Sequence, residues 1–318
     1  MGTDVSIISE PPSKAAAGIE TTYKSRELEG IVDLWFYRPV GFYLAKFFAW
    51  LNFTPTAVSL IGGVFGIVAG RLYFYRVLAL NLAGMFLHVV ANIFDNADGQ
   101  LARLTNQKSQ SGRVIDSLVD HVIWVGIYVH LALRCALSGS LLEVGLLAAA
   151  AGLSHGLQGA AADYHRNGYL YFVKGSSRSA FDLSHHLRIE FQSLRWTEGP
   201  WRKFLLALYM NFTLQQELFA PGLRRLRLVT DHLFPDQIPS WLRDRYRDLA
   251  QPVLRWWTLL MTNTRMLLLF TLLFVGRPVW YFWIELSAFN FLLICLLWQQ
   301  ENASRLLLQL VGARAKPL

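Results

Sequence analysis

Charged residues are scarce in this chain: they make up 16% of its 318 residues, whereas a soluble domain carries about 25%. Apolar residues reach 53%, and the mean hydropathy is +0.31. This balance excludes a disordered or fibrous protein and predicts a chain that lies in lipid. Lysine and arginine exceed the acidic residues by 30 to 22. They are dispersed between apolar runs, so anionic lipid headgroups fit them better than nucleic acid.

Cysteine is almost absent. The two cysteines, Cys135 and Cys295, lie in apolar stretches without a CxxC pair or a nearby histidine, which argues against zinc binding and redox chemistry. Residues 1–30 are polar and lack the short apolar core of a secretory signal peptide. We therefore expect a flexible N-terminal segment and neither cleavage nor export.

Long apolar runs are abundant. A helix that spans a bilayer needs roughly 20 mostly apolar residues, and six stretches approach or reach this length. Thr54 and Pro55 mark the start of the first, because a threonine side chain caps free backbone amides and proline suits the first helical turn. The predicted fold class is all-α, a polytopic membrane protein with six transmembrane helices. These are 56–75, 77–95, 114–136, 139–162, 254–275 and 278–298.

Two longer segments accompany the spans. Residues 31–55 mix aromatic with charged side chains, which is typical of an amphipathic helix in the membrane interface. Residues 163–253 form a long insert that is rich in arginine and has no run long enough to cross. Within it, apolar residues at helical spacing between Trp201 and Phe219 predict an amphipathic helix against membrane or partner. The predicted units are 1–30, 31–55, spans one to four at 56–162, a cytoplasmic or interfacial insert at 163–253, spans five and six at 254–298, and a C-terminal tail at 299–318.

Six crossings place both termini on one side of the membrane. Lysine and arginine in the N-terminal segment, the 96–113 loop and the tail outnumber the four arginines of the opposite face, and basic short loops favour the cytoplasm. We therefore expect cytoplasmic termini and a cytoplasmic active site, in the inner membrane if the source is bacterial. The four opposing residues are Arg71, Arg76, Arg134 and Arg277.

Four aspartates lie around the junction of the second and third predicted helices. Asp95 and Asp98 are three residues apart, and Asp116 and Asp120 four apart, so each pair projects from one face of its helix. The short connection brings the faces together, and the combined negative charge requires cations. Oxygen ligands without cysteine or histidine favour Mg²⁺ or Mn²⁺ over Zn²⁺. Two such ions would bind a diphosphate and leave one carboxylate free as a general base.

Small and basic residues accompany the carboxylates. Gly99 and Ala102 would let a helix or a flat nucleobase approach the backbone closely. Arg103 is suited to pair with a phosphate in a fork geometry. These residues add a phosphate-binding character to the predicted metal site.

The pattern resembles the signature of the CDP-alcohol phosphotransferases, a family of integral membrane enzymes. Asp95-x2-Asp98-Gly99-x2-Ala102-Arg103-x8-Gly112-x3-Asp116-x3-Asp120 matches it at all eight fixed positions. The resemblance implies that a hydroxyl attacks a CDP-alcohol and releases CMP. By similarity, Asp95, Asp98 and Asp116 hold two metal ions, and Asp120 is the general base and shares in metal binding. Gly99, Ala102, Arg103 and Gly112 would line the site for the cytidine diphosphate.

Two further residues are predicted to belong to the site. Many members of the family have an asparagine and a threonine where this chain has Thr56 and Ser59. Ser59 is therefore predicted to face the diphosphate at the start of the first span, where free amides attract anions. Arg265 is predicted to contact phosphate or acceptor, because ionisable groups within a membrane are functional candidates. The alternative is an arginine that extends to the interface.

The sequence leaves the substrates open. The leading interpretation is phospholipid synthesis from CDP-diacylglycerol and a polar alcohol. The reverse pairing, a CDP-linked headgroup of the choline or ethanolamine type with a lipid alcohol, uses the same residues, and Gln100 within the motif resembles members of that type. A membrane prenyltransferase would have more crossings and two separate acidic loops. An ion-coupled transporter would show an inverted repeat or a broken helix near the cluster. The family resemblance also implies a homodimer.

Overall fold

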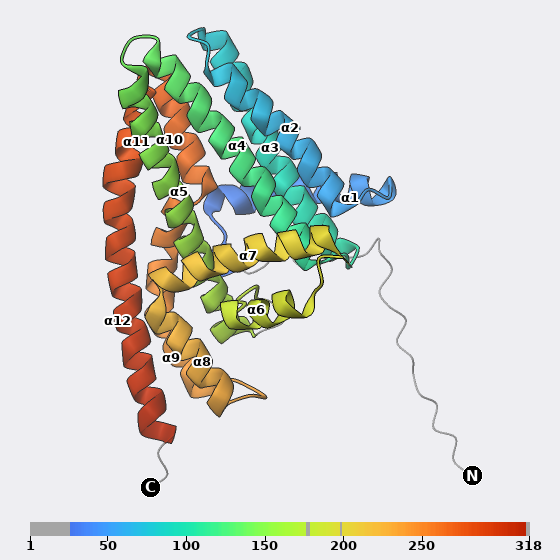
Figure 1. Cartoon of the computed structure of the whole chain (residues 1–318), viewed down its shortest axis with the longest axis vertical. Coiled ribbons are helices and arrows are strands. Elements are labelled where there is room, and N and C mark those ends of the chain that lie inside the picture. Colours follow the sequence, from blue (N-terminus) through green and yellow to red (C-terminus); the bar gives the residue numbers. More distant parts are fainter. Residues whose placement is uncertain (1–25, 176–178, 198, 316–318) are drawn as a thin grey trace, which may run out of the picture.

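The computed structural model describes residues 26–175, 179–197 and 199–315, and these ranges contain helices and no strand (Figure 1). Most of the predicted N-terminal segment, residues 1–25, lies outside the described residues. Short π-helical stretches lead into the first helix (Asp33–Tyr37), extend the fifth (Leu170–Lys174) and join the last two (Glu285–Phe289). The α-helices are α1 (Arg38–Trp50), α2 (Pro55–Tyr73), α3 (Leu78–Leu104), α4 (Gln110–Ala136), α5 (Leu141–Tyr169), α6 (Ser184–Ser193), α7 (Pro200–Phe219), α8 (Pro221–Leu233), α9 (Ser240–Trp257), α10 (Thr262–Phe274), α11 (Val279–Ile284) and α12 (Asn290–Ala315).

Five helical stretches are long and apolar enough to cross a membrane. They are α2, α3, α4, α5 with its π-helical extension, and the continuous α11–α12. A sixth crossing results if α9 and α10, which meet at a bend of 40°, count as one span. The all-α, multi-pass class is confirmed, and the part of the chain that the structure describes holds five or six candidate spans.

The fifth predicted span, 254–275, is wrong as a single helix. The backbone leaves the helix at Met261, between a 3₁₀ turn at Thr258–Leu260 and α10. The Leu260 carbonyl beside the break accepts a hydrogen bond from Arg265 Nε at 3.1 Å. A side chain thus replaces a missing backbone donor. The polar run Thr262, Asn263, Thr264 and Arg265 follows the break directly, but the apolar residues before and after it keep the average hydropathy of 254–275 high enough to look like one span.

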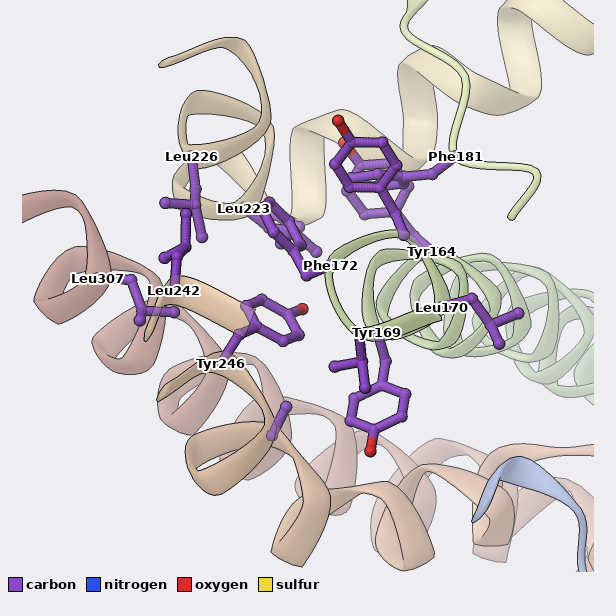
Figure 2. Packing of buried hydrophobic residues seen from close by; sticks show 14 of the residues in the cluster. Tyr164, Tyr169, Leu170, Phe172, Phe181, Leu223, Leu226, Leu242, Tyr246 and Leu307 are labelled. Atoms are coloured by element: carbon purple, nitrogen blue, oxygen red, sulfur yellow. The ribbon is translucent and has the colours of Figure 1, made fainter. Parts of the chain in front are cut away.

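α12 continues to Ala315 through the segment that the hydropathy pattern assigns to a tail. Its last turns lie against α8 and α9. Leu307 packs in a buried core with Leu226 and Leu242 from these helices (Figure 2). Glu301 accepts a hydrogen bond from the Gly222 amide at 3.0 Å. The insert and the C-terminal segment therefore form one packed unit.

α2 positions the two helices that carry the motif. It begins as predicted, with Thr54 Oγ1 accepting a hydrogen bond from the Ala57 amide at 3.2 Å. Its glycines allow close packing: a Cβ at Gly62 would lie 2.7 Å from the Phe94 Cβ on α3, and one at Gly66 would lie 2.6 Å from Ile123 Cδ1 on α4. α2 therefore lies directly against both α3 and α4.

The segment predicted as an interfacial helix is helical from residue 31 to residue 50. α1 packs on the last part of α3, where a Cβ at Gly41 would lie 3.3 Å from the Ala97 nitrogen. The outer side of α1 exposes Tyr43 and Trp50, and the π-helical stretch before it exposes Trp35. The position of this helix in the membrane interface stays a prediction.

Candidate active site

The motif occupies the end of α3 and the start of α4, which are joined by residues 105–109. Oxygens of Asp95, Asp98 and Asp116 all lie within 4.8 Å of one another. Asp98 is buried, and the other two are half-buried. The helical spacing of the acids and the short connection thus bring three carboxylates from two helices to one point.

Asp120 lies one turn further along α4. It lines the same cavity as Asp95 and Asp116, but its carboxylate is not in the group of three whose oxygens converge. The structure therefore separates the fourth aspartate from the other three, while keeping it in the same cavity.

Ser59 reaches this cluster from α2. Its hydroxyl lies within hydrogen-bond distance of Asp98 and 3.2 Å from Asp116 Oδ1. The hydroxyl can donate its single proton to either carboxylate, and it therefore connects Asp98 on α3 with Asp116 on α4. Ser59 can do so because Gly62 and Gly63, one turn later, let α2 approach α3 and α4.

The three carboxylates fit a divalent cation. They offer oxygen ligands only, the kind that hard cations such as Mg²⁺ and Mn²⁺ prefer. Carboxylates at this spacing in a partly buried site repel one another without a compensating positive charge. The hydroxyl of Ser59 orients two of them but carries no charge to balance them.

Gly99 and Arg103 lie together beside the carboxylates on α3. A Cβ at Gly99 would lie 3.4 Å from Arg103 Nη2, so the glycine leaves room for the guanidinium to fold over the helix. The Arg103 Nε is buried and has no hydrogen-bond partner. Ala102 is half-buried on the next turn after Asp98.

Gly112 has a visible role in the start of α4. Its amide donates to Ser109 Oγ at 2.9 Å, and a Cβ at Gly112 would lie only 2.8 Å from the same oxygen. That Cβ would also lie 3.9 Å from Thr56 Oγ1, in the first turn of α2. The N-termini of α2 and α4 are therefore neighbours, and their free amides form a positive end close to the motif.

Comparison with known families identifies the chemistry of this region. Residues 52–164 match the family model of the CDP-alcohol phosphatidyltransferases. By this similarity, residues 52–164 are assigned to a CDP-alcohol phosphatidyltransferase domain. Comparisons with curated proteins and with solved structures gave no match. The family depends on divalent metal ions and takes a CDP-alcohol and an acceptor alcohol as substrates, which agrees with the oxygen cluster of the domain.

The transferase domain comprises α2, α3, α4 and most of α5. α1, the insert and the C-terminal helices lie outside it. The domain boundaries agree with the geometry, because every carboxylate of the site lies on α3 or α4, and Ser59 lies on α2.

Arg265 lies outside this site. Its Nη1 forms an ion pair with Glu285 at 2.5 Å, and its Nη2 donates to Gln158 Oε1 at 2.7 Å. The side chain is buried, with 1% exposed. This corrects the prediction of a phosphate or acceptor contact: the guanidinium joins α5, α10 and the π-helical stretch after α11. An arginine within a membrane can bind a ligand or form a buried ion pair. The sequence did not show which, because the partner Glu285 lies 20 residues further along the chain.

The cavity of the transferase domain includes residues that the sequence did not single out as a site. Asn92 and Thr262 line it together with the aspartates. Asn92 Nδ2 donates to Asn263 Oδ1 at 3.0 Å, and Asn263 Nδ2 donates to Asp33 Oδ1 at 2.7 Å. The start of α10 thus reaches the cavity. Asn92 lies three residues before Asp95 on the same helix face, and this spacing was the available signal.

Gln100 does not support a choice of donor. It is fully buried, and its Nε2 donates to the Arg38 carbonyl at 3.0 Å. It therefore joins α3 to the start of α1, and its place in the motif reflects packing between helices.

Proposed function

We propose that this protein is a transferase of phospholipid synthesis. It moves a substituted phosphate from a CDP-alcohol, with CDP-diacylglycerol as the donor, to the hydroxyl of a polar alcohol, and it releases CMP. The observation that supports this best is the convergence of Asp95, Asp98 and Asp116 within a CDP-alcohol phosphatidyltransferase domain.

Asp95, Asp98 and Asp116 would hold two Mg²⁺ or Mn²⁺ ions, with Asp120 sharing in metal binding. When bound, such ions neutralise the negative charge of a diphosphate and of its displacement. Ser59 orients Asp98 and Asp116 through its hydroxyl. These assignments follow the family motif and the position of each side chain.

Asp120 accepts the proton of the acceptor hydroxyl in this proposal. The acceptor oxygen then forms a bond to the phosphorus that carries the alcohol, the bond between this phosphorus and the bridging oxygen breaks, and CMP leaves with that oxygen. A carboxylate placed beside the cluster, and outside the convergent group, suits this task.

The remaining motif residues hold the cytidine diphosphate. Arg103 pairs with a phosphate, and Gly99 leaves space for its guanidinium. Ala102 and Gly112 have small or no side chains and so leave space for the cytidine diphosphate. The adjacent N-termini of α2 and α4 attract the phosphates through their free amides.

We further propose the arrangement of the chain in the membrane. The cluster and both termini face the cytoplasm, on the side favoured by the basic short loops. The 31–55 segment lies in the interface, and 163–253 is a cytoplasmic or interfacial insert on the same side of the membrane. A homodimer is proposed by analogy with the family alone.

The test is CMP release by the purified protein in detergent with Mg²⁺ or Mn²⁺. CDP-diacylglycerol and CDP-choline are offered separately against polar and lipid alcohols. We expect CMP from CDP-diacylglycerol with a polar acceptor. CMP only from CDP-choline with a lipid alcohol would reverse the assignment of donor and acceptor. No CMP from either donor, by protein that is folded and binds metal, would contradict the proposal.

A further inference from the structure

Helix α7 of the insert has an outer face that does not suit water. Its inner face packs on the protein through buried residues that include Leu205, Leu206 and Thr213. On the outer face, Phe204 is 44% and Leu218 78% exposed. The outer face from residue 204 to residue 219 has no ionisable side chain, whereas the surface of a soluble helix normally does. Its members are Phe204, Leu208, Asn211, Gln215 and Leu218.

α7 runs across the bundle and lies against α4 and α5 (Figure 1). On α4, Arg113 lies 5.8 Å from the Tyr209 ring, and the His121 ring lies 6.4 Å from the Phe212 ring. Asp116 and Asp120 lie between these two positions in the sequence. The last turns of α7 reach α5, where Gln216 Nε2 donates to the Ala160 carbonyl at 3.2 Å. α7 thus lies across the outside of two spans and beside the site.

The outer face of α7 continues a surface that already faces lipid. Directly after the contact with α7, α4 exposes Val122, Val125 and Val129. Exposed valines on a membrane-spanning helix face acyl chains. The lipid-facing strip of α4 therefore begins next to the point where α7 meets this helix, at Phe212 and His121.

The start of α7 has the composition of a membrane interface. Trp196 and Trp201 are 54% and 61% exposed. Arg188 and Arg202 are exposed in the same region. Tryptophan settles at the level of lipid headgroups, and arginine is attracted by anionic lipids.

We propose that α7 lies flat in the lipid, at the boundary between headgroups and acyl chains, with Phe204, Leu208 and Leu218 in contact with acyl chains. Through its contacts with α4 and α5, it holds Asp116 and Asp120 at the depth of the lipid phosphates. The insert thereby sets the height at which the site meets its lipid substrate. The position of α7 does not depend on which CDP-alcohol the protein uses.

Spin labelling tests the proposal. Cys135 and Cys295 are replaced by alanine, and single cysteines that carry a nitroxide are placed by Phe204→Cys, Leu208→Cys and Leu218→Cys. The full chain is reconstituted in bilayers of phosphatidylcholine and phosphatidylglycerol, and collision of the label with oxygen and with a water-soluble nickel chelate is measured. Val125→Cys on α4 and Arg225→Cys on α8 serve as lipid-facing and water-facing controls.

We expect a high ratio of oxygen to nickel collisions at the three α7 positions, close to that at Val125 and above that at Arg225. A ratio equal to that at Arg225 would show that α7 faces water, and it would overturn the proposal. Low collision rates with both reagents would show that protein covers the face, which also overturns it. The measurement needs no turnover, so its result is independent of the proposed reaction.

Discussion

Asp120 differs from the other motif aspartates in its place within the cavity. The other three converge, whereas Asp120 lies beside them. Asp120→Asn removes a proton acceptor and keeps the shape of the side chain. We expect turnover to fall about 10²- to 10⁴-fold while Mn²⁺ binding is largely retained. CMP release and the electron paramagnetic resonance of bound Mn²⁺ measure the two effects.

The matched variant is Asp98→Asn, which removes a buried member of the convergent group. It should weaken Mn²⁺ binding as well as turnover, because the ligand itself changes. Full activity of Asp120→Asn would show that this residue is not the general base.

Ser59 offers a second prediction at this scale, because its hydroxyl contacts two of the three carboxylates. Ser59→Ala leaves these carboxylates without their orienting donor, and groups of this kind typically alter metal affinity about 10- to 100-fold. The Mg²⁺ concentration for half-maximal CMP release should rise accordingly. Ser59→Thr keeps the hydroxyl and should restore the wild-type value; an unchanged value in Ser59→Ala would contradict the assigned role.

Much of the site follows from residue spacing. The intervals between the aspartates place each pair on one helix face, and the short connection predicts that the two faces meet. In the structure, three of the four carboxylates converge. Other residues escape such reasoning. Thr262 lines the cavity from α10, far along the chain, and Arg265 finds its partners only through tertiary packing.

At the scale of helices, the glycines of α2 determine how closely it approaches α4. A Cβ at Gly66 would lie 2.6 to 2.9 Å from three side-chain atoms of Ile123. Gly66→Ala should therefore destabilise the protein by about 1–3 kcal/mol through overpacking. Thermal unfolding in detergent measures the change.

Two variants make this prediction specific. Gly156→Ala on α5 meets nothing within 4 Å and should be neutral or stabilising, since alanine favours a helix. Ile123→Ala in the Gly66→Ala background removes the crowding, so the double variant should lose less stability than the two single losses combined. Equal destabilisation by Gly66→Ala and Gly156→Ala would contradict the packing argument.

Helix starts were more predictable than helix ends. Thr54 and Pro55 identify the start of α2, because a cap and a proline leave a local mark in sequence. The break at Met261 carries no proline or glycine, and the polar residues after it, Thr262 to Arg265, look like an interruption of a span; Arg265 donates to the Leu260 carbonyl beside the break. The extension of α12 likewise depends on packing against α8 and α9.

At the scale of the whole molecule, the insert and the C-terminal segment share a core. Leu307 is buried in it, with 1% exposed, whereas its neighbour Leu306 is 37% exposed. Leu307→Ala should cost about 2–5 kcal/mol in this unit, and Leu306→Ala much less. Limited proteolysis should cut the insert faster in Leu307→Ala. Equal rates for the two variants would show that α12 does not stabilise the insert.

The multi-pass membrane character was evident from composition, because few charges and long apolar runs suffice to predict it. The packing of residues 163–253 against the C-terminal helix could not be predicted from composition. In the sequence, the leucines of α8, α9 and α12 form separate amphipathic faces, and only the folded structure shows that these faces share one core. The extent of the unit formed by the insert and the C-terminal segment therefore depends on tertiary contacts between segments that are distant in sequence.

The central claim is that a CDP-alcohol reacts at the carboxylates of α3 and α4. The most direct measurement is CMP release as a function of Mg²⁺ concentration for the wild type, Asp116→Asn and the control Asp163→Asn, whose carboxylate lies on α5 and accepts a hydrogen bond from Gln216. We predict no turnover without a divalent ion, saturation with Mg²⁺ in the wild type and in Asp163→Asn, and severe loss in Asp116→Asn. Turnover in the presence of a chelator, or wild-type behaviour of Asp116→Asn, would contradict the account.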